Sequence, residues 1–358
     1  MFKRAKCLSS IMDVPIKLRG ITDIINMYDI FLLDQFGVLH DGKNAIPGAI
    51  EVLNEIKRKK NKTCIIVSNS SQRSKFTLNR FYNLGFHEDV VCDAITSGES
   101  TYKYLKESNK YKNKNCFLFS WIEYEKDTFV QSLSELDINI CNSIEDADFL
   151  LFHGTQRMSN GKYISLYNDG ILCEDVKAVL KRAKERNLPA ICANQDFEAI
   201  DPNGKKITMP GQLRKTYEEI YNQPVLSYGK PDPTFFLYAI ALATKAHKNN
   251  YGVRVDAKGN PSLKPLRVLH IGDSLSHDIL GASLSSIDSL LITNHGVHFE
   301  ELENLKFNVN DNSKQFQSML SPIVTTEVQE IPLLFRVCDL ADSLGFPRPS
   351  YILESLKL

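Results

Sequence analysis

Short apolar runs alternate with helical patterns between residues 31 and 99, and this alternation constrains the fold more than any other feature of the sequence. FLLDQF (31–36), TCIIVSN (63–69) and VVCDAITSGE (90–99) have the length and composition of strands. Between them, AIEVLNEIKRKK (49–60) and KFTLNRFYNLG (75–85) have the apolar spacing of helices. Strands that alternate with helices form a parallel sheet covered by helices, so we predict an α/β fold.

The alternation continues in a second block, from about residue 105 to 225. NCFLFS (115–120) and ADFLLFHG (147–154) are apolar runs of strand length, and EDVKAVLKRAKERN (174–187) has helical spacing. PNGKK (202–206) is a turn signal that predicts a hairpin. We predict that this block is an α/β unit of its own.

The alternation of strand and helix patterns resumes after residue 226. LSYGKPDPTFFLYAIALATKA (226–246) predicts a loop followed by a helix, and RVLHIGDS (267–274) predicts another strand. The polar, turn-rich segment 247–265 between them is typical of a surface insertion. The predicted organisation is a discontinuous core domain at 20–104 and 226–358, with an inserted domain at 105–225.

The composition narrows the classes of partner. The 358 residues include 43 basic and 43 acidic side chains, so the chain has no net charge with which to attract nucleic acid, and no such partner is predicted. No apolar run reaches the length of a membrane span, so no membrane partner is predicted. The eight cysteines form no CxxC pair, which argues against a zinc ribbon and suits the reducing cytoplasm. The mildly basic start MFKRAKCLSS leaves an organellar presequence as the weaker alternative to a cytoplasmic location.

Polar side chains follow three of the predicted strands. Asp34, Ser68 and Asp273 each stand at the end of an apolar run. In an open α/β sheet, the carboxyl ends of the strands border the ligand crevice. The sequence therefore predicts a binding site that contains these three residues.

Four segments carry a resemblance to a known family. DQFGVLHDG (34–42), IIVSNSSQR (65–73), YGKPDP (228–233) and IGDSLSHD (271–278) are similar, in order and context, to the motifs of the haloacid dehalogenase-like (HAD) superfamily. The chain most resembles class II, subclass IIA, in which a large α/β cap is inserted between the second and third motifs. This resemblance, which covers about residues 28 to 298, implies a three-layer Rossmann-like core with a parallel sheet, an inserted α/β cap, and hydrolysis of a small phosphorylated metabolite.

The resemblance implies catalytic roles for Asp34 and Lys230. Asp34 is the expected nucleophile, because a carboxylate attacks without first losing a proton and forms an aspartyl-phosphate that water can hydrolyse. Lys230 is expected to neutralise the phosphoryl charge and to keep Asp34 ionised. Ser68 and Asn69 are expected to bind the phosphate, together with the amides of the turn 69–71 at the start of a helix.

Three carboxylates are expected to meet in this pocket, since Asp273 and Asp278 bracket the turn after a predicted strand. Their repulsion with Asp34 favours a bound cation, and Mg²⁺ suits hard oxygen ligands. The expected direct ligands are Asp34, Asp273 and the backbone carbonyl of Phe36. Asp278 would act through water or by orienting its neighbours, and a helix-capping role beside Ser276 is the alternative.

The cap is expected to close over the pocket and to select the substrate. CANQD (192–196) offers Asn194 and Asp196 as cap residues that face the phosphate, with a plain turn after a strand as an equal alternative. Proteins of this class often dimerise through the cap, which makes a homodimer through the cap a prediction for this chain.

Phe36 departs from the family pattern. Phosphatases of this superfamily have an aspartate here, which protonates the leaving oxygen and then activates water. General acid–base help of this kind is worth about a hundredfold to ten-thousandfold in rate. The chain resembles a subgroup of class II proteins with an aromatic residue at this position.

Three interpretations of Phe36 follow. In the first, the protein is still a Mg²⁺-dependent phosphatase, with a reactive leaving group or with His40 or Asp41 as a surrogate acid. In the second, it attacks carbon, as the dehalogenases do. In the third, it binds a phosphorylated metabolite without turnover, in a regulatory role. We predict the first and keep the third as the alternative, because Lys230 and the Asp273–Asp278 pair suit Mg²⁺ and phosphate.

Overall fold

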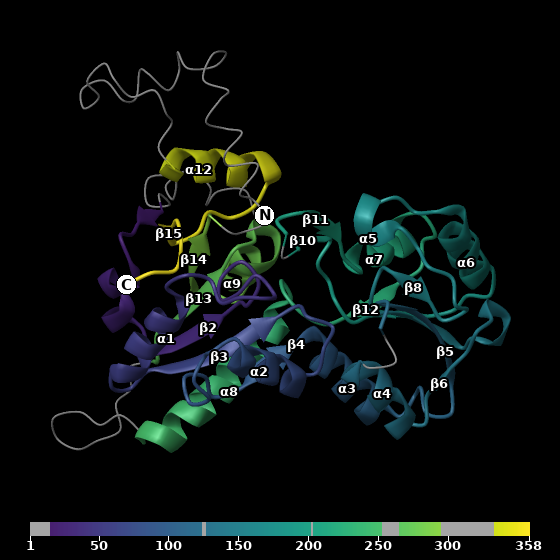
Figure 1. The fold of residues 1–358 in the computed structure, drawn as a ribbon, viewed down its shortest axis with the longest axis horizontal. Helices are drawn as coiled ribbons and strands as arrows, with labels where there is room; N and C mark the ends of the chain where they lie inside the picture. Colours follow the sequence, from purple (N-terminus) through teal and green to yellow (C-terminus); the bar gives the residue numbers. More distant parts are fainter. Residues whose placement is uncertain (1–14, 124–126, 202, 253–264, 295–332) are drawn as a thin grey trace, which may run out of the picture.

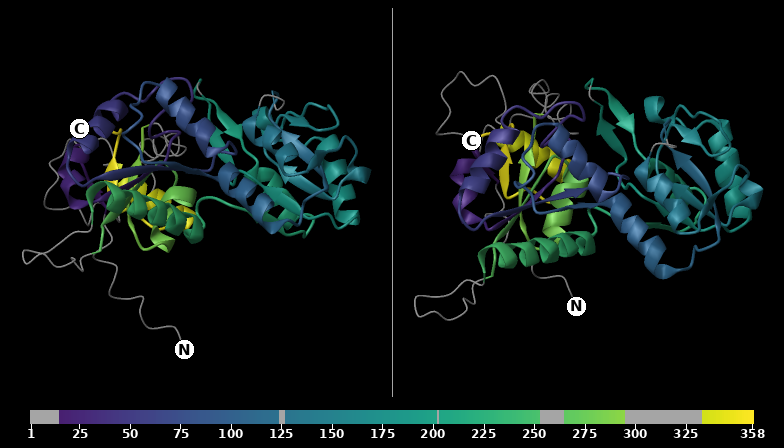
Figure 2. Two further views of the ribbon diagram at one scale, coloured as in Figure 1. Left: turned by 90° about the horizontal axis from the view of Figure 1, so that it is seen from below. Right: turned by 60° about the horizontal axis from the view of Figure 1, so that its bottom comes forward.

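The computed structural model describes residues 15–123, 127–201, 203–252, 265–294 and 333–358. These residues form two α/β units that lie side by side, each with its own sheet (Figure 1). Two further views show the same arrangement, with long helices on the surface of the larger unit (Figure 2). None of the described helices has both the length and the apolar character that a membrane span requires.

The larger unit contains a parallel sheet with seven described strands. In spatial order these are β1 (Ile16–Lys17), β15 (Tyr351–Leu353), β14 (Asp288–Ile292), β13 (Val268–Gly272), β2 (Ile30–Leu33), β3 (Thr63–Ser68) and β4 (Ala94–Thr96). One sheet therefore combines strands from both ends of the chain. The fold class predicted from the sequence is confirmed.

Side chains of the central strand β2 point alternately to the two faces of this sheet. Phe31 and Leu33 pack on the face that α1 (Ala49–Arg58) and α2 (Ser74–Asn83) cover. Ile30 and Leu32 pack on the opposite face, against α8 (Pro233–Tyr251) and α9 (Leu280–Leu284). Because successive residues of a strand face opposite ways, a strand buried on both faces is apolar throughout, as this one is.

The smaller unit contains a second sheet, in which β12 (Val225–Ser227), β9 (Ala190–Cys192), β7 (Phe149–Phe152), β5 (Asn115–Ser120) and β6 (Asn139–Ile140) are parallel neighbours. The short strand β8 (Arg157–Met158) pairs antiparallel with β5. The helices of this unit are α4 (Thr128–Glu135), α5 (Leu166–Asp169), α6 (Glu174–Glu185) and α7 (Gly211–Glu219), and α3 (Ser97–Ser108) leads into it from β4.

The predicted hairpin is present and lies between the two units. It consists of β10 (Glu198–Ile200) and β11 (Lys206–Thr208), which pair antiparallel around the turn signal seen in the sequence. The strand β12 corrects one detail of the expected organisation. The boundary expected between residues 225 and 226 falls inside this strand, which pairs with β9 of the smaller unit.

Two other interpretations of the sequence concern segments that lie partly or wholly outside the described residues. The insertion expected at 247–265 begins as the last turn of α8, which runs to Tyr251, and its residues 253–264 lie outside the described part. The first residues, for which a presequence was the weaker alternative, also lie outside it. In the C-terminal region, α12 (Leu333–Leu344) is present, and the strand β15 that follows joins the main sheet, which the sequence did not indicate.

Candidate active site

Three adjacent strands of the main sheet bring the predicted site residues together. Asp34 follows β2, Ser68 ends β3, and Asp273 follows β13. Because β13, β2 and β3 are parallel neighbours, their carboxyl ends meet at one edge. All three residues line an open cavity of about 1230 Å³, to which residues of both units contribute.

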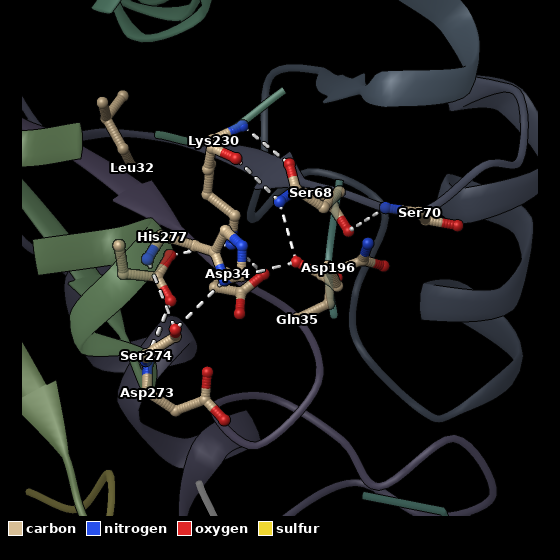
Figure 3. A network of polar contacts seen from close by, with 12 residues as sticks. Leu32, Asp34, Gln35, Ser68, Ser70, Asp196, Lys230, Asp273, Ser274 and His277 are labelled. Carbon is tan, nitrogen blue, oxygen red and sulfur yellow. Dashed lines mark hydrogen bonds and ion pairs between the residues drawn. The ribbon is translucent and has the colours of Figure 1, made fainter. Parts of the chain in front are cut away.

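Lys230 reaches this edge from the loop before α8. Its Nζ lies 2.8 Å from Oδ1 of Asp34 and 2.7 Å from Oδ1 of Asp278. Figure 3 shows the lysine side chain extended toward Asp34. Lys230 is only 2% exposed, so this ammonium group is shielded from water and shared between two carboxylates.

Asp278 is buried behind the two catalytic candidates and fully bonded. Its carboxylate accepts hydrogen bonds from the backbone N–H groups of Asp273 and Ser274, at 3.2 and 3.1 Å. It also lies 2.7 Å from Nε2 of His270. These contacts fix the loop that carries Asp273. Ser274 caps the helical turn Leu275–Ile279 by accepting from His277 N–H, and Asp278 accepts from Ser274 N–H, so Asp278 also takes part in the helix cap that was its alternative role.

His270 was not identified as a site residue from the sequence. It is fully buried in β13, and its Nδ1 lies 3.1 Å from the carbonyl oxygen of Leu32 while its Nε2 faces Asp278. The available signal was a histidine inside the otherwise apolar run RVLHIG, since a buried polar side chain needs partners. Its position indicates that it orients Asp278.

The carboxylates outnumber the cations at this edge of the sheet. One oxygen from each of Asp34, Asp273 and Asp278 lies within 4.8 Å of the others. Burial raises the pKa of Asp34 to about 7, a shift that Lys230 opposes and Asp278 reinforces. Burial also acts to raise the pKa of Asp278, but Lys230 and His270 outweigh it and hold that pKa well below its usual range.

This donor set fits a hard divalent cation. Three clustered carboxylates with one shared lysine leave negative charge that a cation such as Mg²⁺ would neutralise, and oxygen is the ligand atom that Mg²⁺ prefers. Asp278 is less suited than Asp34 and Asp273 to direct coordination, because Lys230, His270 and two amides already occupy its oxygens.

The structure corrects the expected role of Asn69. Its side-chain oxygen accepts from the backbone N–H of Lys230 at 2.7 Å, and its amide nitrogen donates to the Lys230 carbonyl at 3.0 Å and to Asp196 at 2.8 Å. With its polar atoms engaged in this way, Asn69 holds the loop of Lys230 in place and has little capacity left for a phosphate.

The turn after β3 also differs from the expectation. The helix α2 begins only at Ser74, so the amides of residues 69–71 are not its N-terminal amides. Instead, Ser70 N–H donates to Oγ of Ser68 at 3.2 Å, which closes a local turn. The Ser68 hydroxyl hydrogen is still available to a ligand, because that contact uses the oxygen as an acceptor.

The cap residues meet the core at this point. Asp196 lines the cavity, accepts from Asn69 and has Oδ1 3.6 Å from Nδ1 of His277. Asn194 also lines the cavity, but its side-chain oxygen accepts from Asp196 N–H at 2.8 Å. Asn194 therefore forms the turn that was the alternative for it, and Asp196 is the residue of the pair that reaches the core.

Phe36 occupies the position of the missing acid and lines the cavity. Its ring packs edge-on against His40. Both surrogate acids of this loop accept hydrogen bonds from its backbone. Gly42 N–H donates to Nδ1 of His40, and Asp41 Oδ1 accepts from Lys43 and Asn44 N–H. Burial is the main cause that lowers the pKa of His40 to about 4. Both side chains therefore shape the loop.

Comparison with known proteins extends these observations. Two haloacid dehalogenase-like hydrolase families match the chain, one over residues 31–139 and the other over 122–284. No curated protein sequence matches it.

Among solved structures, a haloacid dehalogenase-like hydrolase from Brucella suis 1330 is similar with a TM-score of 0.60 and 26% identity, over 79% of this chain and 90% of that one. A "possible sugar phosphatase" from Cytophaga hutchinsonii has a TM-score of 0.61 and 18% identity, over 95% and 98%. A glycerol phosphate phosphatase from Mycobacterium tuberculosis, in complex with magnesium, has a TM-score of 0.53 and 18% identity, over 93% and 77%.

Proposed function

The chain belongs to the haloacid dehalogenase-like hydrolase superfamily, subclass IIA, and on this premise we propose that it hydrolyses a small phosphate ester through an aspartyl-phosphate at Asp34, with Mg²⁺ as cofactor. The observation that carries the proposal is the buried ion pair of Asp34 and Lys230 beside Asp273 and Asp278. A buried carboxylate held by a lysine at the mouth of a sheet is the arrangement that a phosphoryl-transfer nucleophile needs.

In the proposed reaction, an oxygen of Asp34 attacks phosphorus, and the bond from phosphorus to the ester oxygen breaks. Lys230, whose Nζ lies 2.8 Å from Oδ1 of Asp34, would offset the charge that collects on the phosphoryl group. The Ser68 hydroxyl can donate to a phosphoryl oxygen. Water then attacks phosphorus, releases phosphate and regenerates Asp34.

Asp34, Asp273 and the carbonyl of Phe36 would hold Mg²⁺, with Asp278 orienting the loop behind them. Bound there, Mg²⁺ would neutralise the carboxylates and polarise the phosphoryl group. The raised pKa of Asp34 supports this view, since a nearby cation would lower that pKa and return Asp34 to the ionised form at neutral pH. The magnesium complex of the Mycobacterium tuberculosis phosphatase, which has the same fold, also supports it.

Departure of the leaving group is the step of the proposed reaction for which this loop supplies no proton donor. Since Phe36 cannot donate a proton and His40 and Asp41 are committed to the loop, the ester oxygen leaves without help from these residues. We therefore propose that good substrates have a weakly basic leaving oxygen, as aryl, enol and acyl phosphates do.

The alternative is a regulatory protein that binds a phosphorylated metabolite without turnover. The specific observation in its favour is that an aromatic ring, packed on His40, fills the place of the acid. In that case Asp34, Lys230 and Asp273 would serve recognition alone.

Phosphate release from a panel of aryl, acyl and alkyl phosphates, with and without Mg²⁺, tests the proposal. The proposed function predicts Mg²⁺-dependent turnover that Asp34→Asn abolishes. The exposed acid Glu51 is outside the cavity, so Glu51→Gln is a matched control and should leave the rate unchanged. Ligand binding without turnover in the wild type would favour the regulatory alternative, and equal rates in wild type and Asp34→Asn would refute the nucleophile.

A further inference from the structure

Arg80 on α2 is a cation that the proposed reaction does not use. Its side chain is half-buried and lines the cavity. Its guanidinium carbon lies 5.9 Å from the centre of the Phe36 ring and 5.4 Å from that of Phe76. Among the described residues, no carboxylate lies within ion-pair distance of Arg80 and no hydrogen bond uses its N–H groups.

This state is unusual for an arginine of this chain. Most described arginines form an ion pair, and Arg73, next to the start of the same helix, lies 2.7 Å from Glu99. A guanidinium group keeps its charge at neutral pH and offers five N–H donors in one plane. Two phenyl rings can flank it but cannot accept these hydrogen bonds as an anion does, so its donors remain available to a ligand in the cavity.

Among the charged side chains of the cavity wall, Arg80 differs from Lys230 in its pairing. Lys230 and Arg80 are the lysine and arginine side chains that line the cavity within the described chain, and two carboxylates already share Lys230. Asp41, an acid of the same wall, has its Oδ1 bonded to the amides of Lys43 and Asn44. Arg80 is therefore the cation of this wall that is free to bind an anion.

Phe36 lies between Asp34 and Arg80. Its backbone lies two residues from Asp34, and its ring faces Arg80. A ligand with its phosphoryl group at Asp34 could extend along the Phe36 ring to the guanidinium group. The cavity, at about 1230 Å³, has room for a ligand much larger than inorganic phosphate.

We propose that Arg80 binds a second anionic group of the substrate, a carboxylate or a second phosphate, at the far end of the Phe36 ring. This inference rests on the proposed function for the position of the first phosphoryl group. It narrows the substrate class to phosphorylated acids and bisphosphates. A bidentate contact between arginine and such a group is among the strongest polar contacts in proteins.

Two matched ligand pairs test the inference and separate the two sources of the second anion. 3-Phosphoglycerate is compared with glycerol 3-phosphate, which lacks the carboxylate, and fructose 1,6-bisphosphate is compared with fructose 6-phosphate. Affinity is measured by calorimetry in Mg²⁺ buffer for wild type, Arg80→Gln, Arg80→Lys and Lys75→Gln. Lys75 is exposed on the same helix and does not line the cavity, so its variant removes one charge from α2 without touching the site.

The expected result is a preference of about tenfold to a hundredfold for the doubly anionic member of one pair. The preference should vanish in Arg80→Gln, persist in part in Arg80→Lys and remain intact in Lys75→Gln. No preference in the wild type, or the same preference in Arg80→Gln, would overturn the inference. Turnover of p-nitrophenyl phosphate, whose leaving oxygen is weakly basic, is measured in parallel. A preference that depends on Arg80, in a protein that does not hydrolyse this aryl phosphate, would contradict the proposed hydrolysis and keep the inference, whereas hydrolysis without a preference would do the reverse.

Discussion

The ring of Phe36 lies edge-on against the imidazole of His40, with 4.6 Å between the ring centroids. Phe36 therefore contributes packing at the place where related phosphatases carry an acid. His40 is fully buried beneath it and accepts a hydrogen bond from Gly42 N–H, so it cannot present a proton to the cavity. On the proposed mechanism, Phe36 and His40 therefore provide no acid for the leaving oxygen.

Phe36→Asp should restore the missing acid. We expect an increase in kcat of about a hundredfold or more for alkyl phosphates, within the range that general acid–base catalysis supplies. Aryl phosphates should gain much less in the first step, because a phenolate leaves without protonation. Phe36→Asn is the control, because asparagine has nearly the same shape as aspartate but cannot donate an acidic proton. Equal gains in both variants would show that ring removal, and not proton transfer, is the cause.

Lys230→Met should destabilise the fold as well as abolish turnover. The substitution leaves Asp34 and Asp278 buried without their shared cation, and loss of one partner of a buried ion pair typically costs about 3–5 kcal/mol. Urea denaturation measures the free energy of unfolding. Lys17 pairs with Glu354 at the surface, so Lys17→Met should cost less than about 1 kcal/mol. Similar costs for the two variants would contradict the account of Lys230.

Mg²⁺ should stabilise the wild type by relieving the repulsion among Asp34, Asp273 and Asp278. A ligand that binds only the folded state adds about 2.7 kcal/mol at a concentration one hundred times its Kd, so the thermal midpoint should rise with Mg²⁺. Asp273→Asn should lose this rise and, without Mg²⁺, should melt above the wild type, because it relieves repulsion with Asp34 and Asp278. A full Mg²⁺ response in Asp273→Asn would place the cation elsewhere.

The pH dependence of stability should contain a contribution from His40. Its pKa is lowered from 6.5 to about 4, mainly by burial, so the unfolded chain takes up a proton at a higher pH than the folded chain does. Its contribution is therefore fully present above pH 6.5 and is lost as the pH falls toward 4, by about 3 kcal/mol in total.

The variant His40→Gln isolates this contribution. Its free energy of unfolding should fall less steeply than that of the wild type between pH 6.5 and pH 4, whatever its stability at pH 7. Chemical denaturation at several pH values measures both slopes, and parallel slopes would show that His40 takes up its proton equally in the folded and unfolded states.

The sequence predicted the parts of the fold that local patterns encode. β2, β3 and β13 lie where apolar runs end at polar residues, because burial on both faces requires such runs. The short strand β12 has no such signal, and its membership in the smaller sheet depends on pairing with β9. Local pattern could not assign it to either unit.

The same distinction applies to the site. Asp34, Lys230, Asp273 and Asp278 were identified because they stand in motifs. The contacts of Asn69 with Lys230 span 161 residues of sequence, and no local pattern predicts them. Arg80 lies in an amphipathic helix, where an arginine normally faces solvent, so only the folded chain shows that it lines the cavity.

Pre-steady-state kinetics with p-nitrophenyl phosphate and Mg²⁺ tests the central claim, covalent catalysis at Asp34, most directly. The phenolate leaves readily, but no acid–base residue is available at position 36 to activate water, so the phosphoenzyme should accumulate. We predict a rapid burst of about one p-nitrophenolate per enzyme followed by slow turnover, with acid-quenched protein carrying the phosphoryl group on the peptide that contains Asp34. Linear release without a burst, together with unmodified protein at every quench time, would contradict the claim.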